Sequence, residues 1–96
     1  MAIHSFADPA VHRFFITGEL DRKAGWTAIS KVVARKLDML DFASELGDLR
    51  SPPANRLEAL KADWSGFYSI RINDQWRVVF RWTEGGPADV AVVDYH

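Results

Sequence analysis

Two short segments that alternate in character, residues 67–73 and 76–82, constrain the fold of this chain most strongly. A period of two is typical of β-strands that bury one face. Asn73 and Asp74 lie between the segments, and their short polar side chains favour a turn. The sequence therefore predicts a β-hairpin. On its second strand, one face is apolar and carries Trp76, Val78, Phe80 and Trp82. The other face is cationic and carries Arg77, Val79 and Arg81.

Composition sets outer limits on the fold and the setting. The 96 residues suffice for one domain with a modest core, so we expect a single domain over residues 1–96. The absence of cysteine excludes disulfides and thiolate metal sites and favours an intracellular protein. No apolar run approaches the roughly 20 residues that span a bilayer, and the N-terminus lacks a signal-peptide pattern. We therefore expect a cytoplasmic protein with no membrane partner.

The charge balance argues against a generally basic nucleic-acid-binding domain, because the formal net charge is -1. Residues 55–82 nevertheless carry five cations and three acids. Any contact with nucleic acid must therefore depend on this local excess of positive charge.

Two helices are expected before the hairpin. Asp8 and Pro9 are typical of an N-cap and a first helical position, and Gly18 is a typical end. A second helix is predicted over residues 27–46, with Thr27 as N-cap and Gly47 just past its end. Its apolar residues recur every three or four positions and are Ile29, Val33, Leu37, Leu40 and Ala43. A proline-containing loop, residues 47–54, should follow.

The remaining segments predict further strands. We expect an edge strand at residues 2–6 and strands at residues 57–61 and 89–96, with turns at residues 62–66 and 83–87. Tyr68, Ile70 and Ile72 should face the helices. Helices followed by a run of strands give an α+β domain. Its two N-terminal helices should pack on a mainly antiparallel sheet of four to five strands.

Taken singly, the residues able to do chemistry have ordinary explanations. Asp94, Tyr95 and His96 form a polar C-terminus, and Arg77 with Arg81 fits a solvated sheet face. Lys61 and Glu58 read as surface residues. Three scattered histidines without cysteine give no recognisable metal-ligand spacing. Gly85-Gly86 reads as a turn, and no phosphate-binding loop is present.

A set of short motifs covers nearly the whole chain in a fixed order. The main ones are Asp48-Leu49-Arg50-Ser51-Pro52-Pro53, Asn55-Arg56-Leu57, Leu60-Lys61, Ser69-Ile70-Arg71-Ile72-Asn73, Gln75-Trp76-Arg77 and Val93-Asp94-Tyr95-His96. In this order and spacing they resemble the HigB-type toxins of bacterial toxin–antitoxin modules, within the RelE/ParE superfamily. The resemblance implies a compact RelE-like domain that cleaves translated mRNA on the ribosome without a metal or other cofactor. It also implies a helix-turn-helix antitoxin of the HigA type, through which alone the toxin meets DNA.

The same resemblance implies a catalytic set. The matching positions are Lys61, Arg77, Asp94, Tyr95 and His96. Several members carry a histidine three residues before the lysine, where this chain has Glu58, so Glu58 is a possible acid or base. Four further arginines are read as contacts that track the RNA backbone: Arg50, Arg56, Arg71 and Arg81.

Metal-free cleavage of RNA needs a base for the 2′-hydroxyl proton, an acid for the departing 5′-oxygen, and cations facing the phosphorane. Arg77 suits the last role through its planar fork of donors. Lys61 can be a second cation or the base, and His96 can donate or accept a proton near neutral pH. Asp94 can orient His96 or take the 2′-hydroxyl proton itself. Tyr95 can stack on a base or position the RNA backbone.

Two other functions remain open at this point. The superfamily also contains gyrase poisons that cleave no RNA, so the chain can be a non-nucleolytic ParE-like toxin. It can also be an antitoxin-binding module without catalysis. The nuclease hypothesis requires that the Arg77 guanidinium and the His96 imidazole flank one common spot.

Overall fold

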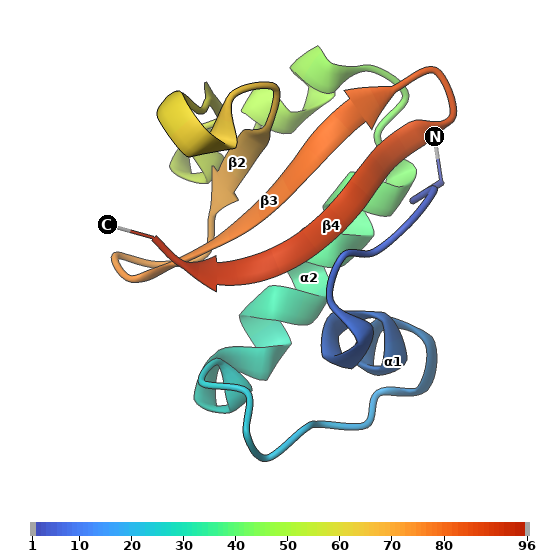
Figure 1. Cartoon of the computed structure of the whole chain (residues 1–96), viewed down its shortest axis with the longest axis vertical. Coiled ribbons are helices and arrows are strands. Elements are labelled where there is room, and N and C mark those ends of the chain that lie inside the picture. Colours follow the sequence, from blue (N-terminus) through green and yellow to red (C-terminus); the bar gives the residue numbers. More distant parts are fainter. Residues whose placement is uncertain (1, 96) are drawn as a thin grey trace.

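The computed structural model describes residues 2–95, and in this range an antiparallel sheet packs against two α-helices (Figure 1). The sheet has four strands in the order β1-β2-β3-β4. The strands are β1 (Glu58–Ala59), β2 (Tyr68–Arg71), β3 (Trp76–Thr83) and β4 (Gly86–Asp94). The helices are α1 (Pro9–Thr17) and α2 (Ser30–Phe42), with short 3-10 helices η1 (Thr27–Ile29), η2 (Leu46–Arg50), η3 (Pro53–Asn55) and η4 (Ala62–Trp64). The predicted α+β class is confirmed.

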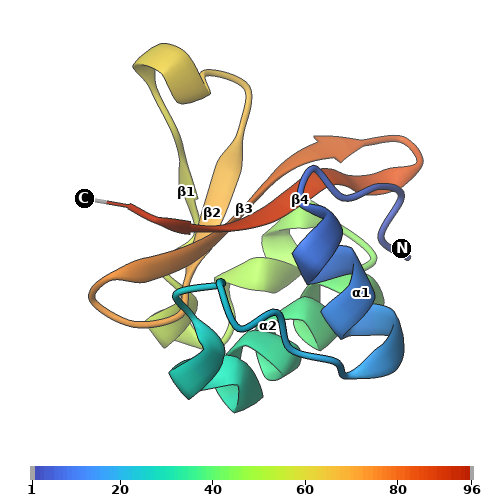
Figure 2. The same ribbon diagram turned by 60° about the horizontal axis from the view of Figure 1, so that its bottom comes forward.

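Both α-helices cover the same face of the sheet (Figure 2), and the core lies between the helices and this face. Fully buried apolar side chains come from both layers: Val11, Val33, Leu37, Leu40, Ile70, Val78, Phe80 and Val90. Burying each such side chain contributes about 1.5–3 kcal/mol relative to leaving it in water. The face of the sheet away from α1 and α2, here called the outer face, is where the polar side chains of the strands gather.

Helix α1 begins and ends at the predicted residues. The Asp8 carboxylate accepts a hydrogen bond from the Ala10 N–H at 2.9 Å, which satisfies a donor that has no partner inside the helix. Gly18 closes the helix with φ 78°, and its N–H donates to the Phe14 carbonyl at 2.8 Å. Glycine suits this left-handed position because it has no Cβ.

The prediction for the second helix is wrong at both ends. Residues 27–29 form a 3-10 helix without a side-chain cap at Thr27, and α2 itself ends at Phe42. At the C-terminal end the difference is explained by Asp48, whose carboxylate accepts hydrogen bonds from the N–H groups of Ser44 (2.9 Å) and Glu45 (3.1 Å). These bonds start η2, so Gly47 lies inside a new helical turn and does not cap α2. The predicted apolar stripe nevertheless faces the core.

The predicted hairpin is confirmed as β2 and β3. The Asn73 side-chain oxygen accepts from the N–H groups of Gln75 and Trp76, both at 2.8 Å, and so forms the turn. Ile70 and Ile72 lie in the core as predicted, and Tyr68 packs against it.

The other strands differ from the prediction in extent. Strand β1 has only two residues, and β4 begins at Gly86, so the predicted turn at residues 83–87 is shorter. Residues 2–6 form no strand, although Phe6 makes one parallel bridge to Val90. Asp89 has φ 51° at an irregularity in the β3–β4 register, which interrupts the row of backbone groups that a fifth strand needs. The predicted loop at 47–54 contains most of η2 and most of η3, and the predicted turn at 62–66 contains η4.

Candidate functional site

The candidate site is built on the outer face of β2 and β3. The register places Arg71 directly opposite Arg77 and Ser69 opposite Val79, so these side chains share the outer face. Ser69 and Val79 are fully buried and form the base of the site. Tyr95, just after β4, joins the same region, because its N–H donates to the Gln75 carbonyl at 3.0 Å and so holds the chain end beside the hairpin turn.

Arg77 contacts side chains from three parts of the sheet. One terminal nitrogen lies 2.8 Å from a Glu58 carboxylate oxygen of β1 and 2.8 Å from the Ser69 hydroxyl of β2. The guanidinium carbon also lies 5.8 Å from the centre of the Tyr95 ring, within the range of a cation–π contact. The Arg77 side chain is only 15% exposed, whereas Glu58 is 50% exposed. The guanidinium is therefore fixed in direction and lies beside a carboxylate that water and ligands can reach.

Two like charges oppose each other at the centre of this surface. Arg71 and Arg77 are direct partners across the β2–β3 ladder, an arrangement that is unfavourable without compensation. Two carboxylates provide it: Asp74 pairs with Arg71 and Glu58 pairs with Arg77. A phosphate that reaches this surface can replace these carboxylates as the partner of two guanidinium groups.

The structure brings together some of the predicted catalytic residues. Arg77, Tyr95 and Glu58 form one cluster. Lys61 is exposed at the start of η4, and no hydrogen bond or ion pair joins it to this cluster in the described range. Asp94 pairs with Trp76 across β3 and β4, so strand alternation directs it to the face opposite Arg77, and it accepts from the Gln75 amide at 2.9 Å. His96 lies outside the described residues.

The predicted RNA-tracking arginines lie at different places. Arg71 is part of the cluster just described. Arg81 is two residues beyond Val79 on the outer face and pairs with Asp89 at 2.8 Å. Arg50 and Arg56 are exposed in the segment that leads into β1.

Sequence reasoning missed three polar residues. Ser69 stands at an outer position of a strand, where alternation alone predicts exposure to water, yet it is buried under Arg77. Lys36 and Asn55 are also buried, and the Lys36 ammonium donates to the Asn55 side-chain oxygen. Burial lowers the pKa of Lys36 below its ordinary 10.5, and the nearby cations Arg35 and Arg71 lower it further. Asn55 belongs to the motif Asn55-Arg56-Leu57, but no local pattern indicates its contact with Lys36, because the two residues belong to different elements.

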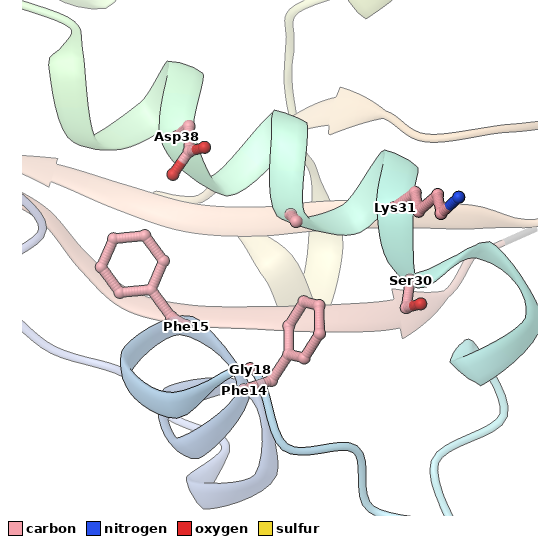
Figure 3. Close-up of a pocket in the computed structure, with 7 residues that line it drawn as sticks. Phe14, Phe15, Gly18, Ser30, Lys31 and Asp38 are labelled. Atoms are coloured by element: carbon pink, nitrogen blue, oxygen red, sulfur yellow. The ribbon is translucent and has the colours of Figure 1, made fainter.

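The surface has two hollows that differ in their position relative to Arg77. A groove of about 390 Å³ separates α1 from α2, with Phe14 and Phe15 on one side and Ser30, Lys31 and Asp38 on the other (Figure 3). It lies on the helical side of the sheet, away from Arg77. A second hollow of about 320 Å³ lies beside β1 and includes Arg50, Glu58 and Tyr68 in its lining.

Residues 2–95 contain no group of three or more histidine, cysteine, aspartate or glutamate side chains placed to hold a metal ion. In the same range, no helix has the length and apolar character needed to cross a membrane.

Solved structures define the class of fold. The toxin–antitoxin complex YoeB–YefM from Staphylococcus aureus matches with a TM-score of 0.55 at 20% identity, over 100% of this chain and 99% of that chain. A YoeB/ParE toxin from Agrobacterium tumefaciens matches with a TM-score of 0.55 at 18% identity, over the full length of both chains. The chain therefore has the fold of these small toxins.

Sequence comparison then identifies the family. The family model of RelE-like toxins of the type II toxin–antitoxin system HigB matches residues 4–96. Toxin HigB-1 of Vibrio cholerae is 44% identical over 59 residues, which is 62% of each protein. Endoribonuclease HigB of Proteus vulgaris is 33% identical over 61 residues, 64% of this chain and 65% of that protein. A Haemophilus influenzae protein without an assigned function is 42% identical over 77 residues, 80% of this chain and 75% of that protein. The chain belongs to the HigB-like toxins.

Proposed function

We propose that this toxin is a ribosome-dependent endoribonuclease that cleaves translated mRNA by acid–base chemistry without a metal ion. Family membership and the Proteus relative named as an endoribonuclease support RNA cleavage. The observation that carries the proposal is the position of Arg77. Its guanidinium is fixed on the outer face beside Glu58 and Tyr95, where one nucleotide can meet a cation, a carboxylate and an aromatic ring.

In the proposed reaction the 2′-oxygen attacks the adjacent phosphorus while a base removes its proton. The 5′-oxygen leaves as it gains a proton from an acid, so the products are a 2′,3′-cyclic phosphate and a 5′-hydroxyl. Arg77 stabilises the phosphorane, whose charge exceeds that of the diester. Glu58 is the base, because its half-exposed carboxylate already lies 2.8 Å from the phosphate-binding guanidinium.

The other members of the predicted set take supporting roles in this proposal. His96 is the acid. Asp94 does not take the 2′-hydroxyl proton in this proposal, because strand alternation directs it to the face opposite Arg77. Lys61 supplies a second cation to the substrate. Tyr95 stacks on a base next to the cleaved linkage and limits the movement of Arg77.

Arg50, Arg56, Arg71 and Arg81 are proposed to track the RNA backbone. Arg50 and Arg56 are exposed on the approach to β1 and are the simplest to test. Removing one phosphate contact should lower the slope of log affinity against log salt by about 0.7 for single-stranded RNA. We expect Arg50→Ala and Arg56→Ala each to show this change in titrations with a short RNA. Arg13→Ala, on α1 at the helical side, should leave the slope unchanged, and equal slopes in all three variants would contradict the assignment.

The proposed partner is a helix-turn-helix antitoxin of the HigA type. The Staphylococcus aureus neighbours are complexes of the toxin YoeB with YefM, which supports an antitoxin partner for this chain. The toxin would meet DNA only through that antitoxin. We propose that residues 1–96 act as one toxin domain in the cytoplasm, where the translating ribosome is the target.

Induced expression followed by primer extension tests this function. Cuts should appear inside translated transcripts and disappear when the start codon of the same transcript is removed. Cuts that persist without translation would contradict ribosome dependence. DNA breaks without mRNA cuts would favour a ParE-like gyrase inhibitor, and growth without either lesion would favour an antitoxin-binding module.

A further inference from the structure

The buried pair Lys36 and Asn55 joins helix α2 to the segment before β1. Lys36 is 6% exposed and Asn55 is fully buried. The Lys36 ammonium donates to the Asn55 side-chain oxygen. The Asn55 amide nitrogen donates in turn to the backbone carbonyls of Leu49 at 3.1 Å and Ser51 at 3.4 Å. One side-chain pair thus ties α2 to Leu49 in η2 and to Ser51 just after η2.

Burying this polar pair between α2 and the segment before β1 is energetically unfavourable. A buried ammonium without a carboxylate partner loses hydration, and the nearby charges of Arg35 and Arg71 have the same sign. Two apolar side chains of similar volume would often stabilise such a position as well or better. Unlike apolar packing, the directional hydrogen bonds of this pair specify where the segment before β1 lies.

The segment it specifies leads directly into the candidate site. Asn55 stands three residues before Glu58, and Glu58 is one of only two residues of β1. Strand β1 pairs with β2 alone, through Glu58 opposite Ser69 and Ala59 opposite Tyr68. So short an edge strand restrains a side chain weakly by itself. The place of the Glu58 carboxylate beside Arg77 therefore depends on how the preceding residues are anchored.

We propose that Lys36 and Asn55 are positioning residues, whose buried hydrogen bonds hold residues 49–57 so that the Glu58 carboxylate meets the Arg77 guanidinium. This inference rests on the proposed function, in which Glu58 and Arg77 act on the RNA. Neither Lys36 nor Asn55 touches the substrate.

Cleavage kinetics test the inference through coupling to Glu58. Lys36→Met removes the ammonium at similar side-chain length. Val33→Ala is the control, because it disturbs the buried face of the same helix and removes none of the hydrogen bonds of the pair. Single-turnover cleavage of mRNA on purified ribosomes should slow by about 10- to 100-fold in Lys36→Met, the range expected when a reacting group is misplaced from a distance. Val33→Ala should cleave at the wild-type rate below its unfolding temperature.

The effect of Lys36→Met should vanish in a Glu58→Gln background, since the positioned group is then already disabled. Equal losses in both backgrounds, or a wild-type rate for Lys36→Met, would overturn the inference and leave the proposed function intact. A wild-type protein that cleaves no mRNA would instead overturn the proposed function.

A spectroscopic measurement tests the positioning without relying on cleavage. A side-chain Nη1–H resonance of Arg77, assigned by its loss in Arg77→Ala, reports the contact with Glu58, because the terminal nitrogen Nη1 makes that contact. Lys36→Met should move it towards its position in Glu58→Gln, and Val33→Ala should not. Asn55→Asp keeps an oxygen for the ammonium but loses both amide N–H donors, so it should move the Arg77 resonance in the same direction. This variant replaces Lys36→Met in the test if Lys36→Met does not fold. A resonance that stays at the wild-type position in the folded variant, while Glu58→Gln moves it, would overturn the inference.

Discussion

At the scale of single residues, Arg77 gains its proposed role from its neighbours. An arginine on an open sheet face is ordinarily mobile and hydrated, but here contacts with Glu58, Ser69 and Tyr95 restrict the guanidinium. A fixed donor group loses less entropy when it binds phosphate and reorganises less as charge develops. Glu58 has two opposed effects in this arrangement, because it orients Arg77 and also competes with the phosphate for it.

These two effects lead to a prediction for Glu58→Gln. Loss of the base should lower the cleavage rate by about 10²- to 10⁴-fold. Loss of the competing charge should strengthen binding to an mRNA whose 2′-hydroxyl is methylated and cannot react. Glu84→Gln, which makes the same charge change in the exposed β3–β4 turn, should alter neither quantity. Cleavage by Glu58→Gln at the rate of Glu84→Gln would exclude Glu58 as the base.

Lys36 gives a prediction for the pH dependence of stability. Its pKa in the folded protein is lower than the ordinary 10.5, mainly because of burial. Between the folded and unfolded pKa values the unfolded chain binds more protons, so the free energy of unfolding contributed by this group rises with pH. The difference in unfolding free energy between the wild type and Lys36→Met should therefore shift in favour of the wild type as pH rises from neutral towards 10.5. Urea denaturation at several pH values measures it, and a constant difference would contradict a lowered pKa.

At the scale of elements, the hairpin and α1 could be predicted because local rules decide them. Alternation from Trp76 to Trp82, with Asn73 in the turn, specifies the hairpin, and Asp8 with Gly18 specifies both ends of α1. The end of α2 could not be predicted in this way, since the Asp48 carboxylate overrides a helical pattern that continues past Phe42. The edge strand expected at residues 2–6 makes only one bridge to β4, so the sheet has four strands in the described range, within the expected four to five.

The cap of α1 gives a prediction at this scale. Asp8→Ala removes the acceptor for the Ala10 N–H and should cost about 1 kcal/mol of stability. For a domain of this size, that loss should lower the melting temperature by about 4–8 °C. Glu19→Ala, which removes an exposed acid just beyond the helix, should change it much less. Calorimetry that shows equal shifts for both variants would contradict the capping role.

The candidate site was predictable in part. Arg77 and Tyr95 were named from the sequence, and the structure places them in contact. The Glu58–Arg77 pair depends on two successive strand registers, one of which involves a strand of only two residues, so no local pattern could indicate it. The predicted meeting of Arg77 with His96 involves a residue outside the described range and stays a prediction.

At the scale of the whole molecule, the sheet separates two kinds of surface. Helices α1 and α2 cover one face of the sheet (Figure 2) and form the core with it. The outer face carries Arg71, Arg77, Arg81, Glu58 and Tyr95. In this near-neutral chain, each of these three arginines pairs with a carboxylate. Changes of exposed charge on the helical side, such as Arg13→Ala, should therefore leave cleavage unaffected, although they alter the net charge equally.

The central claim is that the outer face carries a ribonuclease site with Arg77 in it. A comparison of Arg77→Ala with Arg13→Ala tests this claim. The quantity measured is the rate at which purified protein cleaves ribosome-bound mRNA in a single turnover. Both variants lose one positive charge, but Arg13 is exposed on α1 at the helical side. Loss of a preorganised donor to the transition state should slow Arg77→Ala by about 10²- to 10³-fold. Arg13→Ala should cleave at the wild-type rate. Equal rates for the two variants, with both folded, would contradict a ribonuclease site on the outer face.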